Sequence, residues 1–328
     1  MTRKVRHQRD PRKGLRWDFR RAGRLLFGIM VAALAVFCAS CSSTPKGSRD
    51  VVVKKNEAAD YAKLADSFFF AGQYLSALQF YGEALDGNLS VDYVEGAIMA
   101  RSSLGRVYLT MGRMDDASRE FGDALEDARV FGKSSLLALC LSNLGELYFA
   151  QDRIDEAEEL FSAAEPLAVG DNATVALVAH NRGMVAKAKG DLELAETLIL
   201  MAAAANEKAA RWAELGSNRY MLASIANAQG DIPGAMALAE KALAADKAAE
   251  NVPGIGADLQ ALAKLRRRNG EPELAFDLYR RAFGVWVGFD RVEEARICLE
   301  ALGELALELG KDEYAARYAE LLGRLDGE

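Results

Sequence analysis

The chain has 328 residues, of which 51% are hydrophobic and 27% charged, so it is long and apolar enough to bury a large core. Its formal net charge is −7. Residues 1–40 carry ten of the 41 Lys and Arg but only two of the 48 Asp and Glu, so the remaining chain has a net charge of −15. Such an acidic body argues against a nucleic-acid partner, because phosphate backbones are bound by basic stripes.

The N-terminal segment combines a basic stretch with a short apolar run. Basic residues dominate the first 26 positions, and the apolar run extends from Leu25 to Ala39. A helix of this length would reach about 22 Å, which is short of the ~30 Å hydrocarbon core of a bilayer. We therefore predict that residues 1–40 are a signal peptide and that the rest of the chain is exported.

The apolar run ends in the sequence Cys38-Ala39-Ser40-Cys41. This segment resembles the lipobox of bacterial lipoproteins, although Cys38 stands where that family usually has Leu. The resemblance implies lipidation of Cys41, a membrane anchor on the periplasmic face and a flexible tether over residues 41–57. Ser42 is not the acidic residue that retains some lipoproteins at the inner membrane, which favours the outer membrane. An uncleaved signal anchor or an ordinary secretory peptide are the alternatives.

Residues 58–328 are dominated by an internal repeat. A turn residue recurs at spacings of 40, 40, 38, 40, 40 and 40, at Gly72, Gly112, Asp152, Gly190, Gly230, Gly270 and Gly310. Seven residues earlier stands a small residue: Ala65, Gly105, Gly145, Gly183, Ala223, Ala263 or Gly303. Five residues later stands an alanine: Ala77, Ala117, Ala157, Ala195, Ala235, Ala275 or Ala315.

This pattern predicts pairs of antiparallel helices. The small residue and the alanine allow the two helix backbones to approach closely, and the turn residue ends the first helix in the left-handed conformation. We expect seven helical hairpins, starting near residues 58, 98, 138, 176, 216, 256 and 296. The region from Arg211 to Glu214 contains no Gly or Pro, so the joint between the fourth and fifth hairpins is expected to be a nearly continuous helix.

Two repeats resemble the tetratricopeptide repeat (TPR) family residue for residue. The matching positions are Leu104, Gly105, Tyr108, Ala117, Phe121 and Ala124, and then Leu144, Gly145, Tyr148, Ala157, Phe161 and Ala164. The resemblance implies an all-α, right-handed α-solenoid of seven TPR-like hairpins. The period of about 40 residues exceeds the usual 34, which is typical of the extended-helix subclass found in peptide-binding regulators and scaffolds. Longer helices or longer links would both account for it.

In TPR arrays the first helices of successive hairpins line a concave groove, and the resemblance implies the same here. Four residues after the small one, the groove would present Phe69, Leu109, Phe149, Lys187, Asn227, Arg267 and Leu307. This order predicts a ligand with an apolar part over the first three hairpins and an acidic or carbonyl-rich part over the next three. The alternative is that Phe69, Leu109 and Phe149 fold into the core between repeats.

Other candidate groove residues follow from position alone. Asn143 and Asn181 lie where related repeats use an amide to hold an extended peptide, although either could equally be a solvated polar residue. Arg106, Glu146, His180, Tyr220 and Lys264 would face the same groove. The basic run from Lys264 to Arg268 would also complement the dipole at the end of a helix. Trp286 is interpreted as a plug between the last two hairpins, with an exposed binding residue as the alternative.

No grouping of residues indicates catalysis, a metal or a cofactor. Cys140 and Cys298 lie four repeats apart, which is too far for a disulfide bond, so we expect both to be buried free thiols. The sequence therefore predicts an envelope lipoprotein scaffold that binds a protein or peptide partner in a TPR groove and is not an enzyme. The alternatives are a regulatory receptor that senses a peptide or small ligand, and an accessory subunit of a transport or secretion complex.

Overall fold

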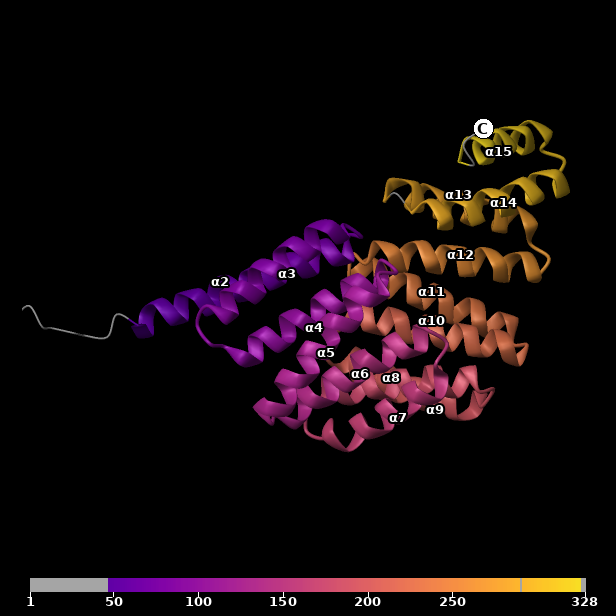
Figure 1. The fold of residues 1–328 in the computed structure, drawn as a ribbon. Coiled ribbons are helices and arrows are strands. Elements are labelled where there is room, and N and C mark those ends of the chain that lie inside the picture. Colours follow the sequence, from indigo (N-terminus) through magenta and orange to yellow (C-terminus); the bar gives the residue numbers. More distant parts are fainter. Residues whose placement is uncertain (1–46, 290, 326–328) are drawn as a thin grey trace, which may run out of the picture. The chain divides into compact units, whose positions relative to one another are not determined.

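The computed structural model describes residues 47–289 and 291–325. The described residues contain fourteen α-helices and one short 3-10 helix but no β-strand, which confirms the all-α solenoid (Figure 1). Most of these residues belong to one compact unit, residues 52–328. The helices form seven consecutive pairs: α2 (Gly47–Phe70) and α3 (Tyr74–Leu89); α4 (Val94–Thr110) and α5 (Met114–Phe131); α6 (Ser134–Ala150) and α7 (Ile154–Ala164), followed by η1 (Glu165–Leu167); α8 (Asn172–Ala188) and α9 (Leu192–Lys208); α10 (Trp212–Gln229) and α11 (Ile232–Ala248); α12 (Val252–Arg268) and α13 (Pro272–Gly288); α14 (Val292–Glu308) and α15 (Asp312–Leu325).

The first helix begins earlier than the sequence analysis predicts. Residues 47–57 were expected to be part of a flexible tether, but they form the first turns of α2. This stretch has no Gly or Pro after Gly47, and Lys54 forms an ion pair with Glu57 one turn later, at 2.9 Å. Cys41 and the predicted signal peptide lie outside the described residues. Among the described helices, none is both long and apolar enough to cross a membrane.

The 40-residue period arises from long helices rather than long links. Eight of the described helices are each 17 residues long: α4, α6, α8, α9, α11, α12, α13 and α14. The links between them are short, such as residues 189–191 and 249–251. Two 17-residue helices and two three-residue links account for the period.

The repeated turn residue has the predicted conformation in every hairpin. Positive φ angles between 61° and 87° occur at Gly72, Gly112, Asp152, Gly190, Gly230, Gly270 and Gly310. Glycine adopts this left-handed region without a Cβ penalty, and Asp152 is a residue type that tolerates it. These residues end the first helix of each pair and allow the chain to reverse.

Two links contain turns that the sequence does not indicate. The expected continuous helix between the fourth and fifth hairpins is wrong, because Ala210 has a φ of 53° and the Arg211 amide donates to the Asn206 carbonyl at 3.0 Å. The link between α3 and α4 likewise turns at a non-glycine residue, Asp92, which has a φ of 54°. A turn made by a non-glycine residue in the left-handed conformation cannot be recognised from the sequence, because no Gly or Pro marks it.

The small residues mark close contacts between the paired helices. Ala117 and Ala157 are fully buried. A Cβ at Gly105 would overlap the Phe121 ring, and one at Gly145 would overlap the Phe161 ring. The predicted close approach is therefore confirmed in these two hairpins, where each glycine makes room for the aromatic ring of the second helix.

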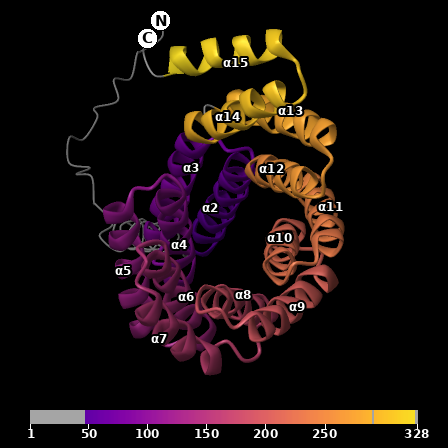
Figure 2. The same ribbon diagram turned by 90° about the vertical axis from the view of Figure 1, so that its right-hand side faces the viewer.

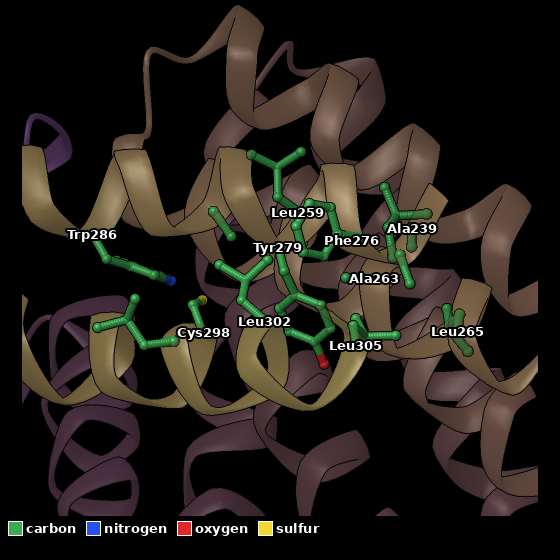
Figure 3. Close-up of a cluster of buried hydrophobic side chains, with 14 of the residues drawn as sticks. Ala239, Leu259, Ala263, Leu265, Phe276, Tyr279, Trp286, Cys298, Leu302 and Leu305 are labelled. Carbon is green, nitrogen blue, oxygen red and sulfur yellow. The ribbon is translucent and has the colours of Figure 1, made fainter. Parts of the chain in front are cut away.

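The largest buried cluster extends through the last three hairpins (Figure 3). Trp286 is buried in it beside Cys298, and a Cβ at Gly256 would lie only 2.6 Å from Trp286 Cζ2. The predicted plug is therefore confirmed. Cys140 and Cys298 are buried free thiols, and burial raises their pKa values to about 11 and about 12.

The first helix of each middle hairpin lies on the inner side of the curve that successive hairpins follow. Figure 2 shows α6, α8, α10 and α12 inside and α7, α9 and α11 outside. Residues from both ends of this unit also meet, since Arg291 Nη1 donates to the Tyr74 hydroxyl at 3.2 Å. The inner helices are therefore the ones on which a groove-binding site must be built.

Candidate functional site

A pocket of about 250 Å³ lies between two inner helices, α10 and α12. It is lined from α10 by Tyr220, Ala223, Ser224 and Asn227, and from α12 by Ala257, Gln260, Ala261, Lys264, Leu265 and Arg268. The α12 residues recur every three or four positions, so they form one face of that helix. Small side chains on both helices leave the space between them open.

The charged lining of this pocket is cationic. Lys264 and Arg268 lie one helical turn apart, and the lining contains no carboxylate. The Arg268 guanidinium donates to Asn227 Oδ1, while Lys264 is exposed and forms no ion pair within the described ranges. Tyr220 is 40% exposed, and partial burial raises the pKa of its hydroxyl, which therefore remains a donor at neutral pH. The pocket is suited to an anionic or carbonyl group.

Two residues predicted from position, Tyr220 and Lys264, come together in this pocket. Arg267 does not join them, because its guanidinium forms ion pairs with Glu304 at 2.8 Å and Glu308 at 3.3 Å on α14. Gln260 and Arg268 were not identified as site residues. Their spacing of four residues on either side of Lys264 is the signal that would have found them.

A second set of predicted residues forms a polar row across α4, α6 and α8. The Arg106 guanidinium lies 5.4 Å from the centre of the Phe69 ring, and its charge also acts on Glu146. Glu146 accepts a hydrogen bond from Asn181 Nδ2 at 2.8 Å. Burial raises the pKa of Glu146. This row links successive inner helices to one another.

The two asparagines expected to hold a peptide backbone are almost completely buried. Asn143 and Asn181 are each 1% exposed. Among the described residues, the side-chain oxygen and nitrogen of Asn143 have no hydrogen-bond partner. The same is true of the Asn181 Oδ1 atom. Both amides therefore lie beneath the accessible surface rather than on it, in contrast to the solvated position considered as the alternative.

The apolar candidates Phe69, Leu109 and Phe149 pack into hydrophobic clusters between helices. Each packs into a different cluster between helices: Phe69 near Tyr81, Leu109 near Phe121, and Phe149 near Phe161. All three remain partly exposed. The long helices thus turn these side chains towards the core between repeats, as the alternative interpretation has it.

His180 is part of a buried joint between the fourth and fifth hairpins. Its Nδ1 atom lies 2.8 Å from Asn218 Nδ2, and Asn218 Oδ1 accepts from Asn206 Nδ2 at 2.7 Å. Burial lowers the pKa of His180 to about 4, so the imidazole is neutral at pH 7. This geometry assigns His180 to the joint rather than to ligand capture. Within the described ranges, no group of three or more His, Cys, Asp or Glu could hold a metal ion.

Residues 96–168 match the family model described as tetratricopeptide repeat. No curated protein matches the chain. Among solved structures, a STAND signal-transduction ATPase with a tetratricopeptide repeat sensor from Pyrococcus horikoshii aligns over 88% of this chain and 44% of its own, with 14% identity and a TM-score of 0.64.

Two further similar structures are Rap proteins. The Rap conjugation gene regulator of plasmid pLS20, in complex with a Phr peptide, covers 79% of this chain and 67% of its own, with 18% identity and a TM-score of 0.57. A Rap protein complexed with Competence and Sporulation Factor covers 83% and 75%, with 18% identity and a TM-score of 0.56. At these identities the likeness establishes the TPR-like solenoid fold.

Proposed function

We propose that this chain is a non-catalytic scaffold that binds an acidic segment of a partner protein or peptide in the pocket between α10 and α12. The observation that carries the proposal is a pocket on two inner helices whose only charged lining residues are Lys264 and Arg268. The TPR-like fold supports it, since two similar solved structures are complexes with a peptide or a named factor.

The chemistry of the pocket favours a carboxylate over a neutral ligand. A hydrogen bond to a charged group contributes about 1.5–3 kcal/mol, which is roughly twice the contribution of a neutral one. Lys264 supplies a flexible ammonium group, whereas Arg268 is already positioned by Asn227. Tyr220 and Gln260 add neutral hydrogen-bonding groups at the same opening. Residues 41–328 carry a net charge of −15, so a cationic pocket within them is a local site that would attract an acidic segment.

Charge reversal in the pocket should weaken the binding of acidic peptides. We expect the variant Lys264→Glu/Arg268→Glu to lose at least about tenfold in affinity, because two charge-assisted hydrogen bonds become repulsions. The measurement is fluorescence polarisation with a labelled pool of synthetic peptides rich in Asp and Glu, compared with the same pool carrying Asn and Gln.

The matched control is Lys241→Glu/Lys247→Glu, which changes the net charge equally on the exposed side of α11. This control should bind like the wild type. Equal weakening by both double variants, or no preference for the acidic pool, would show that the pocket does not recognise carboxylates.

We further propose that the chain is an envelope lipoprotein anchored through Cys41, with the outer membrane favoured. The support is the lipobox-like sequence before Cys41, together with the basic stretch and the short apolar run that precede it. In cells fed a labelled fatty acid, Cys41→Ala should remove the label completely, whereas Cys38→Ala should retain it. Labelling that persists in Cys41→Ala would contradict the anchor.

A regulatory peptide receptor is the second candidate function. The contact between Arg291 and Tyr74 favours it. This hydrogen bond joins the first residue of α3 to the residue before α14, 217 residues later, and it opens if the curvature of the hairpins changes. Small-angle X-ray scattering distinguishes the candidates: a receptor changes its radius of gyration when it binds the acidic peptides, and a scaffold keeps it.

A further inference from the structure

The junctions between the later hairpins share one pair of facing positions, occupied by different residues in each. Between the fourth and fifth hairpins the pair is Asn206 and Asn218, which are hydrogen-bonded. Forty residues later, between the fifth and sixth hairpins, the same positions hold Asp246 and Asp258. After another forty residues they hold Trp286 and Cys298, which pack in the apolar cluster. The middle junction therefore contains two acids where its neighbours are neutral.

The two acids are deeply buried. Asp246 is 3% exposed and Asp258 is 1% exposed. Asn251 Nδ2 donates to Asp246 Oδ1 at 3.0 Å, and a Cβ at Gly216 or Gly254 would overlap the Asp246 carboxyl group. Glycine on both sides thus makes room for this carboxyl group.

Asp258 has no comparable donor. When both acids are ionised, neither carboxyl oxygen of Asp258 accepts a hydrogen bond from the described side chains and backbone, although the Asp246 carboxyl group lies within hydrogen-bonding reach. A buried polar group without a partner is destabilising, and a buried charge without one is more so. The group facing it across the junction is the Asp246 carboxyl, which acts on its charge.

The surroundings supply no cation to compensate these charges. The titratable groups that act on the pair are the two acids themselves and Tyr220 of α10, and the loop contributes the neutral Asn251. Within the described ranges, no Lys, Arg or His is hydrogen-bonded to either carboxyl group. Burial raises the pKa of both acids, and the negative charge of Asp246 raises that of Asp258 further. Two such carboxyl groups cannot both be ionised at low cost.

We propose that Asp246 and Asp258 share a proton at neutral pH and make the junction between the fifth and sixth hairpins a proton-responsive joint beside the α10–α12 pocket. A protonated Asp258 can donate to Asp246, which supplies the missing hydrogen bond, reproduces the hydrogen-bonded arrangement of Asn206–Asn218 and leaves a single negative charge on the acid pair. Loss of that proton places two like charges in a buried junction.

The pocket is close enough to respond to this change. Asp258 follows Ala257 of the pocket lining, and the phenol of Tyr220, which also lines the pocket, is affected by the charge of Asp258. Release of the proton adds negative charge beneath a pocket that carries Lys264 and Arg268. If the proposed recognition of acidic segments holds, alkaline pH weakens it. The proton site itself does not depend on that function.

The sign of the effect on stability follows from the raised pKa values. An unfolded Asp loses its proton near pH 4, whereas the folded pair retains protons above that pH. The folded state therefore binds more protons than the unfolded state above pH 4, and the stability contributed by the pair falls as pH rises through the raised pKa values. The full contribution is present below about pH 4.

Two measurements on the exported body test the proton site without any ligand. We expect infrared spectra of the wild type at neutral pH to show the carbonyl band of a buried protonated carboxylic acid, and Asp246→Asn/Asp258→Asn to lack it. The thermal midpoint of the wild type should fall by at least about 3 °C more than that of this double variant between about pH 5 and about pH 8.5. Identical pH profiles together with no band would overturn the proposal.

The preceding junction offers a contrasting control, because it contains a cation: Arg211 Nε donates to Asn206 Oδ1 at 2.8 Å, and His180 lies beside Asn218. Asn206→Asp/Asn218→Asp should therefore add no second carbonyl band, since Arg211 pairs with the new carboxylate and keeps it ionised. If that variant fails to fold, the wild-type band and its loss in Asp246→Asn/Asp258→Asn still decide the question. The effect on peptide binding is tested separately. If the acidic peptides bind the wild type equally well at about pH 5 and at about pH 8.5, only the link between the acid pair and the pocket is refuted.

Discussion

Replacing Phe161 with alanine is expected to lower the free energy of unfolding by about 3–5 kcal/mol. Phe161 is 0% exposed and packs with Ala157 and with Val185 of the next hairpin. The substitution removes apolar surface from the core between two repeats and leaves a cavity that rigid helices cannot fill completely. The measurement is urea unfolding followed by circular dichroism.

The matched control is Phe131→Ala, which deletes the same ring where it is 43% exposed, at the end of α5. That variant should lose no more than about 1 kcal/mol, since most surface substitutions have small effects. Because a hairpin of a solenoid makes most of its contacts with its neighbours, Phe161→Ala should also separate the unfolding of the N-terminal and C-terminal hairpins. Equal losses in the two variants would contradict the assigned core.

Much of the fold could be predicted because the repeat fixes backbone geometry at particular residues. The turn positions could be recognised because glycine is the residue that most easily adopts a positive φ, and Gly72 to Gly310 recur at nearly constant spacing. The links could not be predicted equally well. Ala210 and Glu250 adopt the same left-handed conformation without being glycine, so neither marks a turn in the sequence.

The candidate site could be predicted only in part, because burial depends on how neighbouring hairpins stack. Tyr220 and Lys264 were identified from their place in the repeat, and both line the pocket. Asn143 was identified by the same reasoning but is buried beneath its neighbours. The helical period gives the direction of a side chain, whereas its depth depends on the curvature that successive repeats produce together.

The acid pair illustrates the same limit. Asp246 and Asp258 stand forty residues after Asn206 and Asn218, and this correspondence is visible in the sequence. The sequence does not show that the two acids meet across the junction, because most acidic residues on helices of this kind are solvated. The structure buries both side chains in the junction. There, Asp in place of Asn exchanges an amide nitrogen for a carboxyl oxygen and so introduces a titratable group into the core.

The glycine of the third hairpin gives the second large effect. Gly145→Ala should destabilise the protein relative to Gly303→Ala by about 1–3 kcal/mol, the usual cost of overpacking a well-filled core. A Cβ at Gly145 would overlap the Phe161 ring, whereas a Cβ at Gly303 meets nothing within 4 Å. Both variants gain the same helix propensity, so the difference between their unfolding midpoints isolates the contact.

The origin of that cost can be tested by combining the two substitutions. Once Phe161→Ala has removed the ring, a methyl group at position 145 has room, and only the helix propensity of alanine remains. Gly145→Ala should therefore stabilise the Phe161→Ala protein by up to about 1 kcal/mol, although it destabilises the wild type. A Gly145→Ala effect that is the same in both backgrounds would show that the glycine is not required by the ring. A reversal of sign would establish that the third hairpin requires a glycine at position 145 because the Phe161 ring occupies the adjacent space.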